Sequence, residues 1–247
     1  MFSDATDPLR RLTNPEEHSE SILGQPFSNV SVALDWLSPS HVVNELVKQT
    51  TGHDVFGEAA AAFAGDWELV WQCAGAFRNL AGALQDLGIN LSCGNVELDL
   101  SWDGNAADAA FTYFAGLSAA VSEQQVPLNE LAKAYETAAE GTYRLMEGVS
   151  GILKDISDAA MIAALAAYAG TASFGTGVGA VTGWGIAAYE AYRIATLTER
   201  ARKLIATGSA IVSGATGYVQ SAAADVDVLA QHRLPQSAYH HPGTALP

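Results

Sequence analysis

Basic residues are scarce in this chain of 247 residues, which has 12 lysines and arginines against 27 aspartates and glutamates. The formal net charge of −15 repels the phosphate backbone of nucleic acids, and no stretch of the sequence concentrates lysine and arginine. We therefore expect no nucleic-acid partner. The same charge repels membranes that carry anionic lipid, although a local apolar segment can still insert.

Cysteine is also scarce, because the sequence contains only Cys73 and Cys93. Two cysteines are too few for a disulfide framework. If both lie on one continuous helix, about 20 residues at a rise of about 1.5 Å separate them by ~30 Å. A disulfide requires Cα atoms within about 7 Å, so we expect two free, small apolar side chains.

Patterns typical of catalytic and metal sites are absent from the sequence. It has no Gly-x-Ser-x-Gly elbow, zincin helix or phosphate loop, and no histidine is spaced as a helical metal ligand. Gly175-Thr-Gly177-Val-Gly179 matches the start of a dinucleotide fingerprint, but no strand precedes it. We predict a non-enzymatic protein without metal or cofactor, although catalytic groups that converge from distant positions would leave no such pattern.

Alanine is the commonest residue, and it favours long, closely packed helices. Two short helices are predicted, one after the Ser38-Pro39 cap and one from Asp54 to Ala64. A long amphipathic helix is predicted from Asp66 to about Cys93-Gly94. Its apolar stripe recurs every three or four residues, at Trp67, Val70, Ala74, Phe77, Ala81, Leu84 and Leu91.

A second long helix is predicted to begin at Asn105, with Asp108 completing a capping pair, and to be interrupted at Pro127. Two such stripes joined by a short connection predict an all-α, elongated bundle built on a long antiparallel helical hairpin. The stripe beyond the proline comprises Leu128, Leu131, Tyr135, Ala138, Thr142, Leu145, Val149, Ile152 and Ile156.

The segment between Asp158 and Glu190 contains no charged residue. At about 30 residues it is long enough to cross a bilayer once, and it also fits a buried hairpin bent around its glycines. A pair such as Gly179-x-x-x-Gly183 allows close helix packing in lipid or in a soluble core, so both alternatives stay open. The glycines of interest are Gly175, Gly177, Gly179 and Gly183.

Composition divides the chain into four parts. Residues 1–30 are polar and rich in proline, and predict a disordered arm. Residues 38–158 form the predicted hairpin domain. Residues 159–230 combine the uncharged segment with a C-terminal helix packed on it, from Glu190 to about Leu229 with breaks near its glycines at 208 and 214. Residues 231–247 predict a disordered tail.

Trp102-Asp103-Gly104 lies at the predicted turn between the two long helices, and small residues follow it up to Phe111. This arrangement resembles the Trp-x-Gly signature of the ESX, or type VII secretion, helical-hairpin family. The indole would cap the end of the hairpin core, and the glycine would let the backbone turn tightly.

Tyr143-Arg-Leu-Met-Glu147 is similar to the Tyr-x-x-x-Asp/Glu element of the same family, at a similar distance from Trp102. On a helix the two side chains share a face, which would offer an aromatic ring and a carboxylate to a receptor. The structural alternative is a tryptophan that fills a core and an ordinary helix pair.

The resemblance implies a secretion substrate, or the helical export domain of an effector, that acts through protein-protein contacts. Its partners would be a secretion ATPase or a small WXG-type helical protein, and it would be cytoplasmic before export. The N-terminal segment begins acidic and lacks the pattern of a Sec signal, which agrees with a non-Sec route. Two alternatives remain, a membrane-active protein that inserts residues 159–189 and a self-assembling structural protein that forms homo-oligomers.

Overall fold

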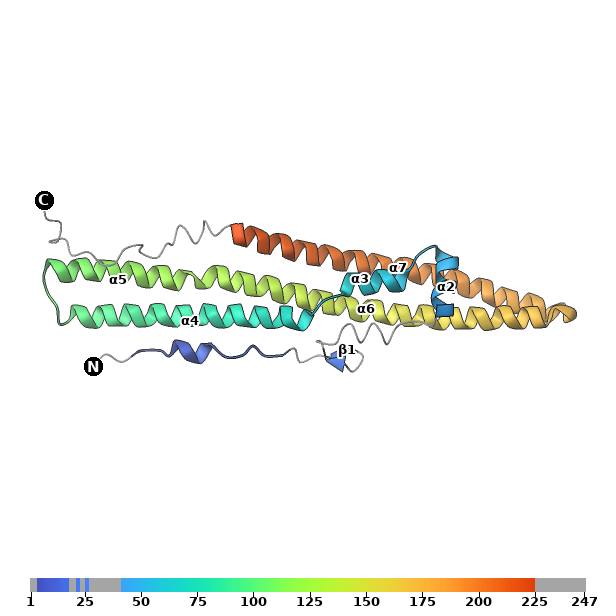
Figure 1. Ribbon diagram of the computed structural model, residues 1–247, viewed down its shortest axis with the longest axis horizontal. Helices are drawn as coiled ribbons and strands as arrows, with labels where there is room; N and C mark the ends of the chain where they lie inside the picture. Colours follow the sequence, from blue (N-terminus) through green and yellow to red (C-terminus); the bar gives the residue numbers. More distant parts are fainter. Residues whose placement is uncertain (1–3, 18–20, 23–24, 27–40, 225–247) are drawn as a thin grey trace. The chain divides into compact units, whose positions relative to one another are not determined.

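Long α-helices make up most of the computed structural model, which describes residues 4–17, 21–22, 25–26 and 41–224 (Figure 1). The predicted all-α class is confirmed, and the strand pairing in these ranges is a two-residue antiparallel ladder. The elements are η1 (Pro8–Arg11), β1 (Ser21–Ile22), β2 (Gln25–Pro26), α2 (His41–Thr51), α3 (Val55–Phe63), α4 (Trp67–Asp99), α5 (Asn105–Glu123), α6 (Gln125–Ala172), η3 (Phe174–Thr176) and α7 (Val178–Ala224).

These elements divide between two units. Unit 1 comprises residues 1–17, 70–137 and 215–247, and unit 2 comprises residues 18–69 and 138–214. Helices α6 and α7 each contribute residues to both units. The division therefore differs from the predicted boundary at residue 158, because α6 continues through that position.

In unit 1, α4 and α5 pack antiparallel through small side chains. Asn95 Nδ2 donates to the carbonyl of Phe111 at 2.9 Å, and Ser118 Oγ donates to the carbonyl of Gly88 at 2.8 Å. A Cβ added at Gly88 would lie 3.0 Å from the Ser118 carbonyl oxygen. Glycine at this position therefore permits the close approach of the two helices.

The predicted interruption near Pro127 is present, three residues earlier than the proline itself. Helix α5 ends at Glu123, and α6 begins at Gln125. Pro127 thus lies in the first turn of α6, where its missing N–H costs no hydrogen bond within the helix. Tyr135 of α6 then packs on Phe77 of α4, with ring centroids 5.5 Å apart.

Two predicted boundaries beside the α4–α5 connection were wrong. Helix α4 continues to Asp99, beyond Cys93, and both cysteines are free as expected. The N-cap of α5 is Gly104 and not Asn105, and no side chain caps the helix there. The predicted capping pair of Asn105 with Asp108 is therefore absent, because Asn105 already belongs to the helix.

The predicted breaks of the last helix at Gly208 and Gly214 were also wrong, because α7 is continuous to Ala224. Glycine inside a helix costs only about 1 kcal/mol relative to alanine, which packing readily offsets. Gly208 lies against Phe63, whose ring carbon would be 3.1 Å from an added Cβ. Glycine at 208 therefore makes room for a buried phenylalanine.

The core of unit 2 lies between residues 138–172 of α6 and 178–214 of α7, with α2 and α3 packed on them. As the periodicity predicts, Val149, Ile152 and Ile156 are buried. The largest fully buried apolar side chains of this unit are Val47, Val55, Phe63, Met146, Val149, Leu153, Ile156 and Ile194.

Charged groups connect the short helices of unit 2 to each other and to α7. Arg202 Nε binds Glu58 at 3.1 Å, and Lys48 Nζ lies 2.9 Å from Asp54. Asp54 also caps α3 by accepting from the Gly57 N–H at 3.0 Å. The hydrogen bond from Lys48, aided by that from Gly57, lowers the pKa of Asp54 against the opposing effect of desolvation.

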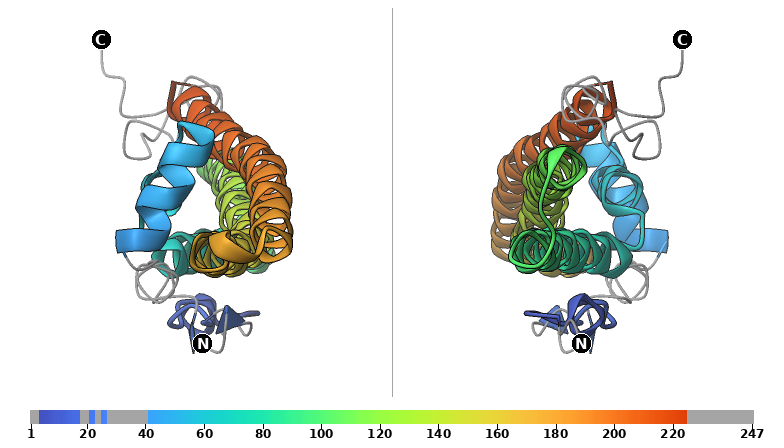
Figure 2. Two further views of the ribbon diagram at one scale, coloured as in Figure 1. Left: turned by 90° about the vertical axis from the view of Figure 1, so that its right-hand side faces the viewer. Right: turned by 90° about the vertical axis from the view of Figure 1, so that its left-hand side faces the viewer.

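The uncharged segment forms two helical arms that meet at η3, a turn that faces the viewer in the left panel of Figure 2. Gly177 adopts a φ of 67°, which favours glycine. A Cβ added at Gly183 would lie 2.6 Å from the backbone N and Cα of Gly170. Gly183 thus allows close packing as predicted, and its partner across the interface is Gly170.

Some predicted features lie outside the described residues. These are the Ser38-Pro39 cap, most of the arm beyond residue 17, the end of the last helix near Leu229 and the tail at 231–247.

Gly183→Ala should lower the free energy of unfolding by about 1–3 kcal/mol, because the new methyl group meets backbone that cannot move aside cheaply. Gly185→Ala is the matched control. Its Cβ meets nothing within 4 Å, so it should stabilise the helix by about 0.5–1 kcal/mol. Urea unfolding followed by circular dichroism measures both, and equal effects would contradict the packing described.

Candidate functional site

The Trp-x-Gly motif lies in the connection between α4 and α5, which faces the viewer in the right panel of Figure 2. Gly104 has a φ of 104°, and its carbonyl accepts the first hydrogen bond of α5, from Asp108 N at 3.0 Å. A side chain at 104 would be strained in this conformation. Trp102 is 37% exposed, so its surface is only partly buried.

The Tyr143 and Glu147 pair lies on α6 within unit 2. Tyr143 is 4% exposed, whereas Glu147 is exposed. The expected joint surface of a ring and a carboxylate is therefore absent, because the helix turns the ring into the core. Tyr143 packs and Glu147 remains accessible.

The segment from residue 159 to residue 189, here called the apolar hairpin, distributes its side chains by size. The small residues Ala159, Ala160, Ala163 and Ala180 are buried, together with Gly170 and Gly183. The large ones point outward. Those that are at least one-third exposed are Met161, Ile162, Leu165, Tyr168, Phe174, Val178, Val181, Trp184, Ile186 and Tyr189.

The sequence left open whether the apolar hairpin is buried in the core. In the structure, some of its small residues are buried, whereas its large apolar residues are exposed. Exposed single apolar residues are common, but a contiguous group of large ones marks an interaction surface. In Figure 1 the two arms run on beyond α2 and α3 to their connection at η3. In the sequence, this surface is indicated by the lack of charged residues on either arm. The periodicity of an amphipathic helix does not reveal it, because that pattern requires a polar face.

The glycines of this region have distinct positions. Gly175 lies in η3, Gly177 follows it, and Gly179 is in the first turn of α7. Gly183 is placed against another helix as predicted, whereas an added Cβ at Gly175 or Gly177 would meet nothing within 4 Å. Gly170 was not predicted as its partner, although the spacing Ala166-x-x-x-Gly170 carries the same small-residue pattern.

The N-terminal segment, residues 4–17, lies along α4 in unit 1 and is not the predicted disordered arm. Thr6 N donates to Asn90 Oδ1 at 2.9 Å, and Arg11 Nε pairs with Asp86 at 2.9 Å. Pro15 packs over Gly75, where an added Cβ would lie 2.9 Å from its ring. The segment therefore binds residues of α4 that lie outside its predicted apolar stripe.

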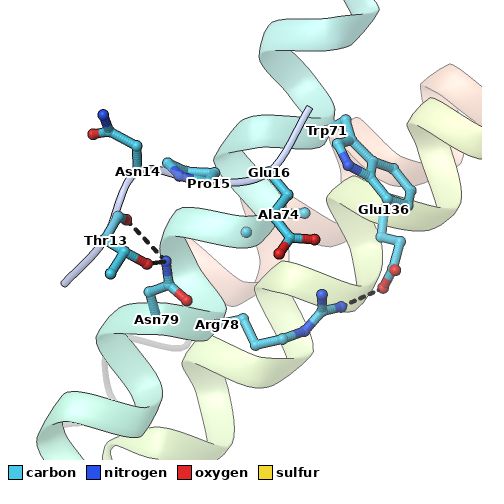
Figure 3. Close-up of a pocket in the computed structure, with 10 residues that line it drawn as sticks. Thr13, Asn14, Pro15, Glu16, Trp71, Ala74, Arg78, Asn79 and Glu136 are labelled. Carbon is cyan, nitrogen blue, oxygen red and sulfur yellow. Dashed lines mark hydrogen bonds and ion pairs between the residues drawn. The ribbon is translucent and has the colours of Figure 1, made fainter. Parts of the chain in front are cut away.

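A cavity of about 200 Å³ lies between this segment, α4 and α6 (Figure 3). Arg78 in its lining forms an ion pair with Glu136, and Asn79 Nδ2 donates to the Thr13 carbonyl at 3.0 Å. Arg78 and Asn79 thus bind groups within the cavity lining, and the lining includes neither histidine nor cysteine. They tie the N-terminal segment to the helices. The lining residues are Thr13, Asn14, Pro15, Glu16, Trp71, Ala74, Gly75, Arg78, Asn79 and Glu136.

A second cavity of about 430 Å³ is more apolar. It lies where the segment meets α4 and α5, and its lining includes Pro8, Leu87, Leu91, Leu98 and Phe114. Its polar neighbours include Asn90, which is already bonded to Thr6.

Clusters of metal-ligating side chains and membrane-spanning helices are both absent from the described part of the chain. Within residues 4–17, 21–22, 25–26 and 41–224, no three His, Cys, Asp or Glu side chains are arranged to hold a metal ion. Among the helices of those same ranges, none has the length and apolar character needed to cross a membrane.

Known proteins offer no guide, since neither family models, nor curated proteins, nor solved structures match this chain. Two features of the described residues stand out as candidate sites. They are the connection that carries Trp102 and Gly104, and the apolar hairpin.

Arg11→Ala should release the N-terminal segment, because it leaves the carboxylate of Asp86, which is 6% exposed, without its ion pair. Chymotrypsin should then cleave at Leu9 and Leu12 several times faster than in the unmodified chain. Arg10→Ala is the matched control, since Arg10 pairs only locally with Asp7 at the surface. Equal cleavage rates in the two variants would contradict the docked segment.

Proposed function

We propose that this chain is a non-enzymatic substrate, or the helical export domain of an effector, of a type VII (ESX-like) secretion system. It acts through contacts between proteins. The observation that carries the proposal is the position of Trp102 and Gly104, which lie together in the connection between two antiparallel helices.

The geometry of this connection supports the proposal in two ways. Gly104 occupies a backbone conformation that other residues rarely adopt, which gives the glycine of the motif a physical role. The Trp102 indole keeps over a third of its surface accessible, so a partner can bury it on docking. Buried tryptophans contribute strongly to protein interfaces.

The proposed partners are the ATPase of the secretion machinery or a small WXG-type helical protein. Export follows a non-Sec route, and the protein is cytoplasmic beforehand. Because Tyr143 is buried, recognition at that end relies on the exposed Glu147 carboxylate, and Tyr143 acts by packing. The proposal therefore rests more on Trp102 than on the Tyr-x-x-x-Glu element.

Trp102→Ala should lower export by at least about tenfold, since it removes the main aromatic anchor of the proposed interface. Gly104→Ala should act in the same direction through backbone strain. Export is measured by immunoblot of culture filtrate and cell pellet, in a cell that carries a type VII system and in one that lacks its ATPase.

Leu100→Ala is the matched control, because Leu100 is 85% exposed in the same connection and has no part in the motif. Its export should equal that of the unmodified chain. Thermal unfolding by circular dichroism checks that all three variants fold. Unchanged export of folded Trp102→Ala, or ATPase-independent export of the unmodified chain, would refute the proposal.

A further inference from the structure

We propose that the apolar hairpin enters one leaflet of a bilayer of neutral lipid and anchors the protein there without crossing it. This inference goes beyond the proposed export function and does not depend on it. Its starting point is the exposure of large apolar side chains on both arms, which reaches 70% for Leu165, 78% for Val178 and 77% for Val181.

The exposed apolar surface of the hairpin is broadest on its second arm. On α7, at about 3.6 residues per turn, the exposed side chains of Val178, Val181, Trp184 and Ile186 spread over more than half of the helix circumference. The remaining part faces α6 through Gly183. An apolar surface of this width exceeds the stripe of an ordinary amphipathic helix, and it is typical of a helix that is buried in lipid or in a large protein core.

The length of the arms matches one leaflet. The uncharged part of α6, residues 159–172, extends about 21 Å, and that of α7, residues 178–189, about 18 Å. Half of a hydrocarbon core of about 30 Å is about 15 Å. Each arm is therefore long enough to reach the middle of the bilayer, so the hairpin can enter and leave through the same leaflet. This agrees with the absence of a membrane-spanning helix among the described residues.

Aromatic residues mark the level at which the hairpin would leave the lipid. Tyr189 and Tyr192 are 64% and 72% exposed at the base of the second arm. From Tyr189 to Val178 the helix extends about 16 Å, so tyrosines at the headgroup level place the turn near the bilayer centre. Amphipathic aromatic rings are enriched at that level of membrane proteins.

Charge defines both the end of the hairpin and the kind of lipid. Asp158 and Glu190 are the first charged residues below the arms, and Glu190 is 6% exposed and accepts from Arg193 at 3.4 Å. No basic cluster is present in the hairpin to attract anionic headgroups. With a net charge of −15, the protein prefers neutral lipid.

The direct test is flotation of the full chain with phosphatidylcholine vesicles. Val181→Asp places a charge in the hydrocarbon region and should weaken partitioning by at least about tenfold. Val126→Asp is the matched control, the same change at another valine that is 55% exposed on a helix. It should partition like the unmodified chain.

Trp184 provides a readout that does not depend on flotation, because it lies on the hairpin and is 52% exposed. Vesicles should shift its emission to shorter wavelength, and brominated lipid should quench it. The difference between the unmodified chain and Trp184→Phe isolates this signal from the other tryptophans. A shift that persists in Trp184→Phe would count against the proposal.

Four further results would count against the insertion of the apolar hairpin into a neutral leaflet. Absence of binding to phosphatidylcholine vesicles, or equal loss for Val181→Asp and Val126→Asp, would overturn the proposal. So would self-association without lipid binding that Val181→Asp abolishes, because the hairpin would then join copies of this chain. Binding that requires anionic lipid would overturn the preference for a neutral bilayer.

Discussion

The contact between the backbones of Gly170 and Gly183 determines how closely the end of α6 and the start of α7 pack within unit 2. Neither residue has a side chain, so the two helices approach closely and leave space between them only for alanine. Large apolar side chains in the same segment therefore have to point outward. The glycines and alanines at this contact therefore cause both the close packing of the helices and the exposure of the large apolar side chains. For this reason the uncharged segment is not a buried core.

Glycine has a related role in unit 1, on two different faces of α4. Gly88 admits Ser118 and the rest of α5, while Gly75 and Gly82 make room for Pro15 and Arg11 of the N-terminal segment. Helix α4 thus packs against a helix on one side and an extended segment on the other. The connection at its end, with Trp102, remains accessible as the candidate docking point for a partner.

Helix positions follow from sequence periodicity, because alternating spacings of three and four residues place Val149, Ile152 and Ile156 on one buried face. Predictions from local sequence fail where contacts between residues far apart in the sequence determine the structure. Gly208 does not break α7 because Phe63 fills the space beside it, and Tyr143 is buried because the same face of α6 carries the core. Residues 4–17 look disordered by composition, yet Arg11 and Thr6 find partners more than seventy residues away.

If the outer surface of the apolar hairpin contacts lipid, as we propose, the collision accessibility of spin labels attached to it must change when vesicles are added. Cys73 and Cys93 are free and can be replaced by serine, after which single labels are attached at 165, 178 or 126. With phosphatidylcholine vesicles, labels at 165 and 178 should collide with oxygen and be shielded from a water-soluble nickel chelate, while the label at 126 should stay accessible to nickel. Equal nickel accessibility at all three positions, with and without vesicles, would contradict the account.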